Sequence, residues 1–360
     1  MPQRLFELAI ERHVFPAAAV EVGRVDGVLW REAFGTLTYA EDAAATTIDT
    51  IFDLASLTKV LATAPLVMRA IDAGRLRLDD RVADLMPLWR GSDRDSVTIG
   101  DLLEHASGLT AYLPFFRDYE GREEFERAIC TMPLEYSPRT QSVYSDLGFI
   151  LLGFMLEDVN HAPLARQFDE LAEDAGLPAV AFRDRGTQDR VTDGARAGAP
   201  AIAPTELDLW RGRLLQGEVH DENAWALGGA AGHAGLFGTA SGVGTFARAV
   251  LRGLFGGESF AASGTLQRFT RKSAVPNSSR ALAWDTMLPT SSCGTRLSPR
   301  AIGHTGFTGT SLWIDPAQNL YVVLLTNRVH PTRENNEIQA VRRRLHDAIV
   351  ERWPSGFERR

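Results

Sequence analysis

Short apolar runs typical of strands are confined to the two ends of this chain, and helical periodicity fills the middle. Strands are predicted at residues 17–22, 28–33, 310–314 and 320–325. Asp26-Gly27, between the first two, is typical of a hairpin turn. Helices are predicted at both extremities, over residues 1–15 and residues 336–353.

The middle of the chain, from about residue 76 to residue 282, is mostly helical in pattern, with long loops that carry Gly and Pro. Its predicted helices include residues 98–104, 121–129, 147–160 and 242–254. Residues 186–204 hold few large apolar side chains and are predicted to form an extended surface loop. Ahead of this region, a long apolar helix is predicted from Ser56, with a bend at Pro65 and an end at Gly74.

Strands at both ends and helices between them predict a split domain. Residues 1–75 and 283–360 would form an α/β (α+β) domain, in which an antiparallel sheet is flanked by helices. Residues 76–282 would form an inserted, mostly helical domain. Ser56 would then lie where the sheet meets the helical region, and such junctions are common ligand sites.

Composition narrows the class of protein. The chain has 360 residues, of which 44% are hydrophobic and 23% charged, and these values are ordinary for a globular protein with a substantial core. Its formal charge of −8 argues against nucleic acid as a partner, because phosphate binding requires a basic surface. The run Arg342-Arg343-Arg344 lies in the predicted last helix and is interpreted as a solvated face.

Cysteine and histidine spacing argues against further kinds of site. Cys130 and Cys293 form no Cys-x-x-Cys pair and the histidines show no His-x-x-x-His spacing, so no disulfide framework, metal or cofactor is expected. Residues 1–15 lack the apolar core of a signal peptide, and no later apolar run is long enough to span a bilayer. The sequence predicts a cytoplasmic protein without a membrane partner, although a chain whose leader had been removed would look the same. The oligomeric state is left open.

Lysine is almost absent from the chain: of 38 basic side chains, only Lys59 and Lys272 are lysines. Arginine serves where only charge is needed, whereas burial can drive a lysine to the neutral amine, which accepts a proton. Lys59 follows Ser56 by three residues, a spacing that places both on one face of a helix. A serine beside such an amine is an activated nucleophile, but a solvated lysine would show the same spacing. Lys272 is interpreted as a surface residue.

Two further stretches are candidates to complete a catalytic site. Tyr144 ends a polar loop just before a predicted helix, and a nearby cationic lysine would lower its pKa and favour proton shuttling. His304 lies in a Gly-rich segment before a strand, where it could titrate near neutral pH and a substrate could approach closely. Each residue, taken alone, could equally be a surface side chain.

Taken together, three motifs resemble those of one family. Ser-Leu-Thr-Lys at 56–59, Tyr-Ser-Asp at 144–146 and His-Thr-Gly at 304–306 are similar to the motifs of class C β-lactamases and their penicillin-binding-protein-like relatives. Those relatives include D-Ala-D-Ala peptidases, β-lactamase-like esterases and muropeptide amidases. Residues 102–109, 147–153 and 235–240 are also similar, so the resemblance extends from about residue 15 to residue 350.

The resemblance implies a role for each matching residue. Ser56 would be the acylated nucleophile, and Lys59 and Tyr144 would transfer protons, with the choice of base left open. The backbone N–H groups of Ser56 and Phe307 would form the oxyanion hole. The substrate side would be lined by Asp146, His304, Thr305 and Gly306.

Two positions depart from the family pattern. The usual Asn of the second motif is Asp146, and the usual Lys of the third is His304. A neutral amide thus becomes an anion, and a fixed cation becomes a group charged only at lower pH. Both changes weaken attraction for a substrate carboxylate, so efficient β-lactam hydrolysis is not expected. Arg328 or Arg333 would restore the lost cation, or both would be surface arginines.

Other classes of protein fit less well. No serine stands in the Gly-x-Ser-x-Gly frame of an α/β-hydrolase, and the dinucleotide-like residues 242–247 lack a preceding strand. A non-catalytic binding protein of the same fold would not need Ser56, Lys59 and Tyr144 together. The sequence therefore predicts a serine hydrolase without metal or cofactor, which cleaves an ester, amide or lactam of a small or peptidic substrate through an acyl-enzyme. A true class C β-lactamase is the alternative.

Overall fold

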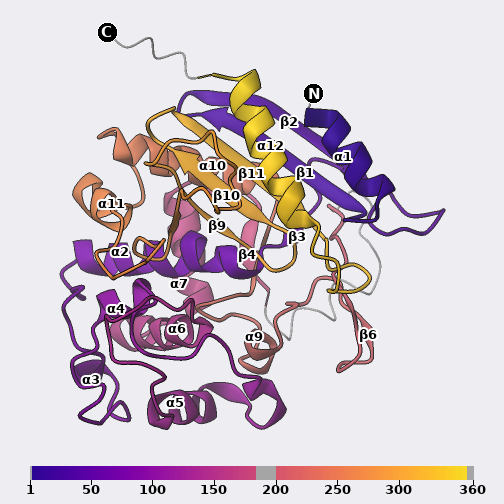
Figure 1. The fold of residues 1–360 in the computed structure, drawn as a ribbon. Coiled ribbons are helices and arrows are strands. Elements are labelled where there is room, and N and C mark those ends of the chain that lie inside the picture. Colours follow the sequence, from indigo (N-terminus) through magenta and orange to yellow (C-terminus); the bar gives the residue numbers. More distant parts are fainter. Residues whose placement is uncertain (1, 184–199, 355–360) are drawn as a thin grey trace.

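The computed structural model of the protein describes residues 2–183 and 200–354 (Figure 1). Most of the predicted surface loop, residues 186–199, lies outside the described residues. Within the described ranges, none of the helices combines the length and the apolar character needed to cross a membrane.

The two ends of the chain form one antiparallel sheet. Its strand order is β2-β1-β11-β10-β9-β8, so the first strands lie beside the last ones. The strands are β1 (Ala17–Arg24), β2 (Gly27–Gly35), β8 (Asp285–Thr286), β9 (Ile302–Thr305), β10 (Ser311–Asp315) and β11 (Leu320–Thr326). Every neighbouring pair is antiparallel, and Val20 of β1 faces Leu324 of β11. The predicted class, an antiparallel sheet flanked by helices, is confirmed.

Helices cover both faces of this sheet (Figure 1). On one face, α1 (Pro2–Glu11) and α12 (Ile338–Arg352) pack on each other and on the side chains of Val20 and Leu324. On the other face, α10 (Ala240–Leu254) packs against β1 and β11. Successive side chains of a strand point to opposite faces, so a strand that is buried throughout requires both layers.

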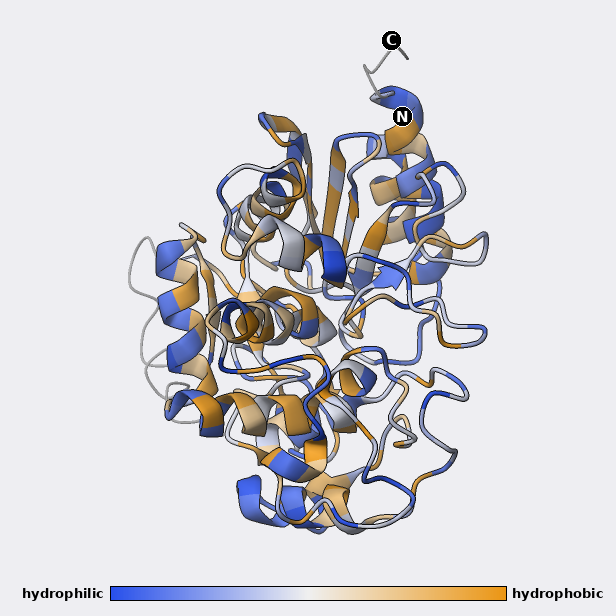
Figure 2. Ribbon diagram, turned by 90° about the vertical axis from the view of Figure 1, so that its left-hand side faces the viewer, coloured by the Kyte–Doolittle hydropathy of each residue, from blue (hydrophilic) through white to orange (hydrophobic). Residues whose placement is uncertain are grey.

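The rest of the chain forms a helical region on one side of the sheet (Figure 1). Its elements are α2 (Ala64–Asp72), α3 (Val82–Leu85), α4 (Ile99–Leu103), α5 (Gly121–Thr131), α6 (Asp146–Asn160), α7 (Leu164–Asp174), α9 (Glu222–Ala226) and α11 (Ser263–Phe269), with the short strands β3 (Phe52–Asp53), β4 (Val180–Phe182), β5 (Leu207–Asp208), β6 (Arg213–Leu214) and β7 (Leu236–Gly238). Helices at the surface carry alternating hydrophilic and hydrophobic bands (Figure 2). In α6, by contrast, residues 147–156 are apolar and all buried.

The predicted domain division at residues 75/76 and 282/283 stays a prediction. Helix α10 belongs by sequence to the predicted insertion, yet it packs on the sheet. One hydrophobic core also joins Val323 of the sheet with Leu151 of α6. The sheet and the helical region therefore share a core, in which the site described below is held.

The helix predicted from Ser56 is less regular than expected. It begins as a 3₁₀ turn (Ala55–Leu57), continues as a π-helical turn (Lys59–Thr63) and becomes α-helical only at Ala64. Pro65 has no N–H to donate to the preceding turn, which explains the change of geometry there, and the predicted bend stays a prediction. The helix ends as predicted at Gly74, whose φ of +69° suits the reversal.

The interpretation of residues 342–344 as a solvated face was wrong in part. Arg342 is only 6% exposed, because its guanidinium group lies under the turn between β9 and β10. Arg344 is exposed, as predicted. Helical periodicity identifies the face of a helix but not the loops that fold over that face.

Candidate active site

The backbone around Ser56 is held in an unusual conformation. Ala55, just before it, has a φ of +47°, which is costly for a residue with a side chain. The buried carboxylate of Asp53 accepts hydrogen bonds from the N–H groups of Ala55, at 2.8 Å, and His220, at 2.7 Å. These bonds hold the strained turn and place the Ser56 hydroxyl at the edge of a cavity.

Lys59 is fully buried, with 0% of its surface exposed, and its amine has three close polar neighbours. Its Nζ lies 3.1 Å from Ser56 Oγ, 3.0 Å from the carbonyl oxygen of His233 and 2.7 Å from Asp146 Oδ1. The predicted Ser–Lys pair is therefore in contact, and the solvated-lysine alternative does not hold.

Tyr144 completes this group from the opposite side. The Lys59 Nζ atom lies 5.0 Å from the centroid of the Tyr144 ring, and the Tyr144 hydroxyl is close enough to the Ser56 and Lys59 side chains for both to affect its pKa. The backbone next to it is fixed, because the Ser145 N–H donates to His105 Nδ1 at 3.0 Å. The Tyr144 ring lies between two imidazoles, with ring centroids 4.7 Å from His105 and 5.8 Å from His304. Three segments far apart in sequence thus meet, and the catalytic roles of their side chains stay predictions.

The electrostatics differ from the sequence expectation. Burial favours the neutral amine of Lys59, but the Asp146 carboxylate and the Tyr144 hydroxyl outweigh it, so the pKa of Lys59 lies above its ordinary value. Burial also raises the pKa of Tyr144 by more than Lys59 lowers it. The expectation of a neutral lysine and an acidified tyrosine was therefore wrong for the resting protein. The cause is Asp146, whose charge compensates that of Lys59.

His304 is a neutral hydrogen-bonding group in this setting. Burial, together with Lys59 and Arg280, holds its pKa well below the usual value. Its Nδ1 lies 2.9 Å from the carbonyl oxygen of Thr305, which can only accept, so Nδ1 carries the proton. Its Nε2 is buried and has no partner among the described residues. His304 therefore does not replace the fixed cation of the family motif.

The predicted oxyanion hole consists of two backbone N–H groups on facing segments. Ser56 stands in the first turn of its helix, where backbone N–H groups have no partner within the helix. Phe307 follows β9, and no described residue accepts a hydrogen bond from its N–H. The Phe307 side chain is 48% exposed at the mouth of the cavity. Both N–H groups are thus available to a ligand.

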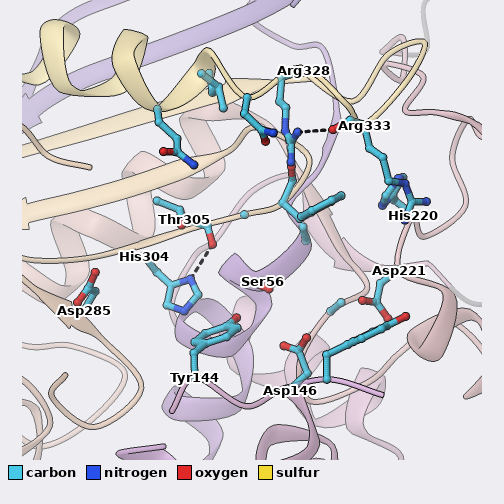
Figure 3. Close-up of a pocket in the computed structure, with 18 of the residues that line it drawn as sticks. Ser56, Tyr144, Asp146, His220, Asp221, Asp285, His304, Thr305, Arg328 and Arg333 are labelled. Atoms are coloured by element: carbon cyan, nitrogen blue, oxygen red, sulfur yellow. Dashed lines mark hydrogen bonds between the residues drawn. The ribbon is translucent and has the colours of Figure 1, made fainter. Parts of the chain in front are cut away.

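These groups border one cavity of about 610 Å³. Figure 3 shows Ser56 in the cavity wall, between the Tyr144–His304 side and the side of Asp146 and Asp221. The described residues that line it include all the predicted substrate-side residues, namely Asp146, His304, Thr305, Gly306, Arg328 and Arg333, together with Tyr112, His220, Asp221, Glu222, Arg280, Asp285, Asn336, Gln339 and Arg342. A cavity of this size accommodates a small molecule or a short peptide.

Neither arginine suggested by the sequence offers a free guanidinium group. Arg333 is paired with Glu206, at 2.5 Å, and with Glu222, at 2.8 Å. Arg328 donates to the carbonyl oxygens of Phe307, Arg333 and Asn335, and burial lowers its pKa. Both line the cavity, but their hydrogen-bonding capacity is used within the protein.

The sequence missed Arg280, which is a cation without a partner among the described residues. It lines the cavity, and its guanidinium carbon lies 5.1 Å from the centroid of the Tyr144 ring. No motif marks it, because it belongs to a loop ahead of β8. Asp285, across an isolated strand bridge from Arg280, lies on the same side of the cavity.

The sequence also missed an Asp–His pair behind Lys59. His233 Nε2 lies 2.8 Å from Asp221 Oδ1, and Asp221 caps α9 by accepting from the Ala224 N–H at 2.8 Å. The carbonyl oxygen of His233 is one of the three neighbours of the Lys59 amine. The His233–Asp221 contact therefore holds in place the loop whose His233 carbonyl oxygen accepts from Lys59. Within residues 2–183 and 200–354, no three His, Cys, Asp or Glu side chains are grouped as a metal site would require.

The chain is similar to known proteins along nearly its whole length. The model that describes the family Beta-lactamase matches residues 3–346. A protein of Escherichia coli (strain K12) named "Putative D-alanyl-D-alanine carboxypeptidase" is 30% identical over 355 residues, which cover 88% of this chain and 79% of that protein.

Solved structures with the same fold include EstCE1, titled a hydrolase with promiscuous acyltransferase activity. It has a TM-score of 0.72 at 21% identity and covers 96% of this chain and 97% of its own. Simvastatin synthase (LovD) from Aspergillus terreus has a TM-score of 0.74 at 17% identity, over 99% of this chain and 98% of its own. The octameric penicillin-binding protein homologue from Pyrococcus abyssi has a TM-score of 0.73 at 18% identity, over 97% and 76%.

Proposed function

The chain belongs to the beta-lactamase family of serine hydrolases, and we propose that it cleaves ester or peptide bonds through an acyl-enzyme on Ser56. The observation that carries this proposal is the Ser56–Lys59 hydrogen bond at the cavity, with Tyr144 next to both side chains. A hydroxyl in contact with two proton carriers is what nucleophilic catalysis requires.

In acylation, Ser56 Oγ attacks the substrate carbonyl, and the oxyanion is bound by the N–H groups of Ser56 and Phe307. Because Lys59 is protonated at rest, it accepts the Ser56 proton only after it has lost one of its own, and the Asp146 carboxylate, 2.7 Å away, opposes that loss. Tyr144 delivers a proton to the leaving group, and water then deacylates Ser56 by the reverse transfers.

A panel of substrates tests this proposal. We expect the wild-type protein to hydrolyse p-nitrophenyl esters and D-Ala-D-Ala peptides and to act weakly on nitrocefin, since Asp146 and neutral His304 disfavour a β-lactam carboxylate. Ser56→Ala is expected to lose about 10³-fold or more in kcat on each substrate. Turnover that survives in Ser56→Ala, or fast hydrolysis of nitrocefin alone, contradicts the proposal. The latter result supports the class C β-lactamase alternative.

For the substrate class, we propose a short peptide whose terminal carboxylate faces Arg280. Arg280 supports this because its charge in the cavity has no partner among the described residues. A curated relative bears the name of a carboxypeptidase, whose substrates end in a carboxylate. The cavity thus offers a cation in place of the one missing at His304, from a different segment than the Arg328–Arg333 loop.

Arg280→Ala tests this assignment. Loss of one charge-assisted hydrogen bond should raise KM for a D-Ala-D-Ala peptide about tenfold or more. KM for the same peptide with its carboxylate converted to an amide should stay within about twofold. An equal rise for both peptides would mean that Arg280 shapes the cavity and does not bind the carboxylate.

A cytoplasmic location, in which such an enzyme would recycle wall peptides or hydrolyse small esters, stays part of the proposal. Fractionation of cells that express the natural gene, followed by immunoblotting, tests it. Recovery in the cytoplasmic fraction is expected, and recovery outside the cytoplasm would contradict it.

A further inference from the structure

The turn between β9 and β10, residues 306–310, is held by a buried arginine that has no counter-charge nearby. Arg342 of α12 donates to the carbonyl oxygens of Gly306, at 3.0 Å, and Thr310, at 2.7 Å. No described carboxylate pairs with it, and its Nε has no partner among the described residues. A buried guanidinium group without an anion is destabilising, so its presence under this turn suggests a task beyond folding.

The bond from Arg342 fixes the direction of one oxyanion donor. The carbonyl group of Gly306 and the N–H of Phe307 belong to the same planar peptide and point in opposite directions. Arg342 and the Gly309 N–H, at 3.1 Å, both donate to this carbonyl oxygen. On the other side of Phe307, Arg328 Nε donates to the Phe307 carbonyl oxygen at 2.8 Å. The two peptides that flank Phe307 are thus each held by an arginine.

Two threonines tie this turn to the segment that carries the nucleophile. Thr308 Oγ1 donates to the Asp53 carbonyl oxygen at 2.8 Å, and Thr310 Oγ1 donates to the Leu54 carbonyl oxygen at 3.0 Å. The approach is close enough to require glycine at 306, where a Cβ would lie 2.7 Å from the Leu54 carbonyl oxygen. These two hydrogen bonds therefore set the distance between the Phe307 and Ser56 N–H groups.

We propose that Arg342 is a positioning residue that fixes the oxyanion hole by orienting the Gly306–Phe307 peptide. Donors aimed in advance at the developing negative charge stabilise a transition state, and a displacement of about 1 Å loses about 100-fold in rate. The inference rests on the proposed acyl-enzyme function. It adds a residue that lines the cavity and acts on the oxyanion hole through the backbone of the turn.

Arg343 provides a matched control on the same helix. It also donates to two carbonyl oxygens at 2.9 Å each, those of Ser291 and Pro289, in a loop outside the cavity lining. Arg342→Met and Arg343→Met each remove two such bonds, and because Arg342 is buried while Arg343 is half-buried, the two are compared by activity per folded molecule. Only Arg342 acts on the oxyanion hole.

The experiment compares kcat, KM and inhibition by a boronic acid, whose adduct with Ser56 Oγ places an oxygen in the oxyanion hole. Arg342→Met should lower kcat about 30- to 100-fold with KM within about threefold, and weaken boronate binding by a similar factor. Arg342→Lys, which keeps a donor, should recover part of the loss. Arg343→Met should change kcat and boronate affinity by no more than about twofold.

Equal kinetic losses in Arg342→Met and Arg343→Met would overturn the inference, provided that the wild-type protein is acylated on Ser56. Failure of the wild type to become acylated would instead refute the proposed function itself. If Arg342→Met does not fold, Thr308→Val replaces it. A fall of about tenfold in kcat supports the inference that the held turn positions the oxyanion hole, and an unchanged kcat overturns it.

Discussion

Two buried charge clusters in this molecule look alike in composition and differ in what surrounds them. In the sheet, the fully buried carboxylate of Glu21 contacts Arg31, at 2.6 Å, Arg248, at 2.9 Å, and the Tyr321 hydroxyl, at 2.7 Å. This Glu21 cluster joins β1, β2, β11 and α10. A Cβ at Gly244 of α10 would lie 1.9 Å from the carboxylate, so the space is filled.

The second cluster, around Lys59, is also buried and paired, but it borders a cavity. Near it, the Nε2 atoms of His105 and His304 and the Nδ1 atom of His233 are buried without partners among the described residues. The polar groups around Glu21 form hydrogen bonds within the protein, whereas these three imidazole nitrogen atoms near Lys59 form none with the described residues. The comparison indicates that burial of charge does not by itself mark the site of chemistry, because only the Lys59 cluster of the two borders the cavity.

Lys59→Arg should have the largest effect on activity, and it tests whether the Lys59 cluster takes part in catalysis. Arginine keeps the positive charge beside Asp146 but cannot act as a proton acceptor, so acylation should fall about 10³-fold or more. Lys272→Arg is the control and should leave the rate unchanged. Steady-state kinetics on a p-nitrophenyl ester measures both, and near-normal activity of Lys59→Arg would show that Lys59 does not transfer protons.

Glu21→Gln tests whether the Glu21 cluster contributes to stability alone. Loss of the carboxylate leaves Arg31 and Arg248 without their anion, and the free energy of unfolding should fall by about 3 kcal/mol. Activity per folded molecule should not change, because the cluster does not contact the cavity. Urea denaturation and titration of active Ser56 measure the two effects. A loss of activity that exceeds the loss of folded protein would contradict the separation of the clusters.

Asp146→Asn should have a smaller effect than the other two substitutions, and it should appear in the pH dependence of activity. Asp146 raises the pKa of both Lys59 and Tyr144, so its removal lowers both values and supplies their basic forms at lower pH. The acid limb of kcat/KM should therefore move to lower pH, while the wild type keeps its limb at higher pH. An unmoved limb would mean that the Lys59–Asp146 pair does not control acylation.

The same substitution has a consequence for stability. The pKa of Lys59 is higher in the folded than in the unfolded protein, so the ion pair contributes stability below the ordinary lysine pKa and loses it as pH rises through the folded value. Asp146→Asn should remove this contribution at neutral pH. The difference in stability between wild type and variant should shrink at strongly alkaline pH.

The sequence predicted four of the six strands of the sheet and several helices because their patterns are local, but it missed the short strands β8 and β9. Strand runs at the two ends and the apolar periodicity of α6 and α10 fall within about two residues of the observed bounds. The motif spacing also selected Ser56, Lys59 and Tyr144, which the fold brings into contact. Chemistry that depends on residue type and motif order is therefore visible in the sequence.

What the sequence did not predict depends on contacts between distant segments. Arg280 reaches the cavity through the path of a loop that has no motif, and Arg342 is buried by a turn that lies 32 to 36 residues away in the chain. The raised pKa of Lys59 follows from the 2.7 Å approach of Asp146, which spacing alone does not give. Each of these requires the three-dimensional arrangement.

The most direct test of the account is mass spectrometry of the protein after incubation with an activated phosphonate. The account predicts one adduct per chain, located on the peptide that contains Ser56, with none on Ser56→Ala and strongly slowed formation on Lys59→Arg. No adduct on the wild-type protein, or an adduct on another residue, would contradict the central claim and favour a non-catalytic binding protein.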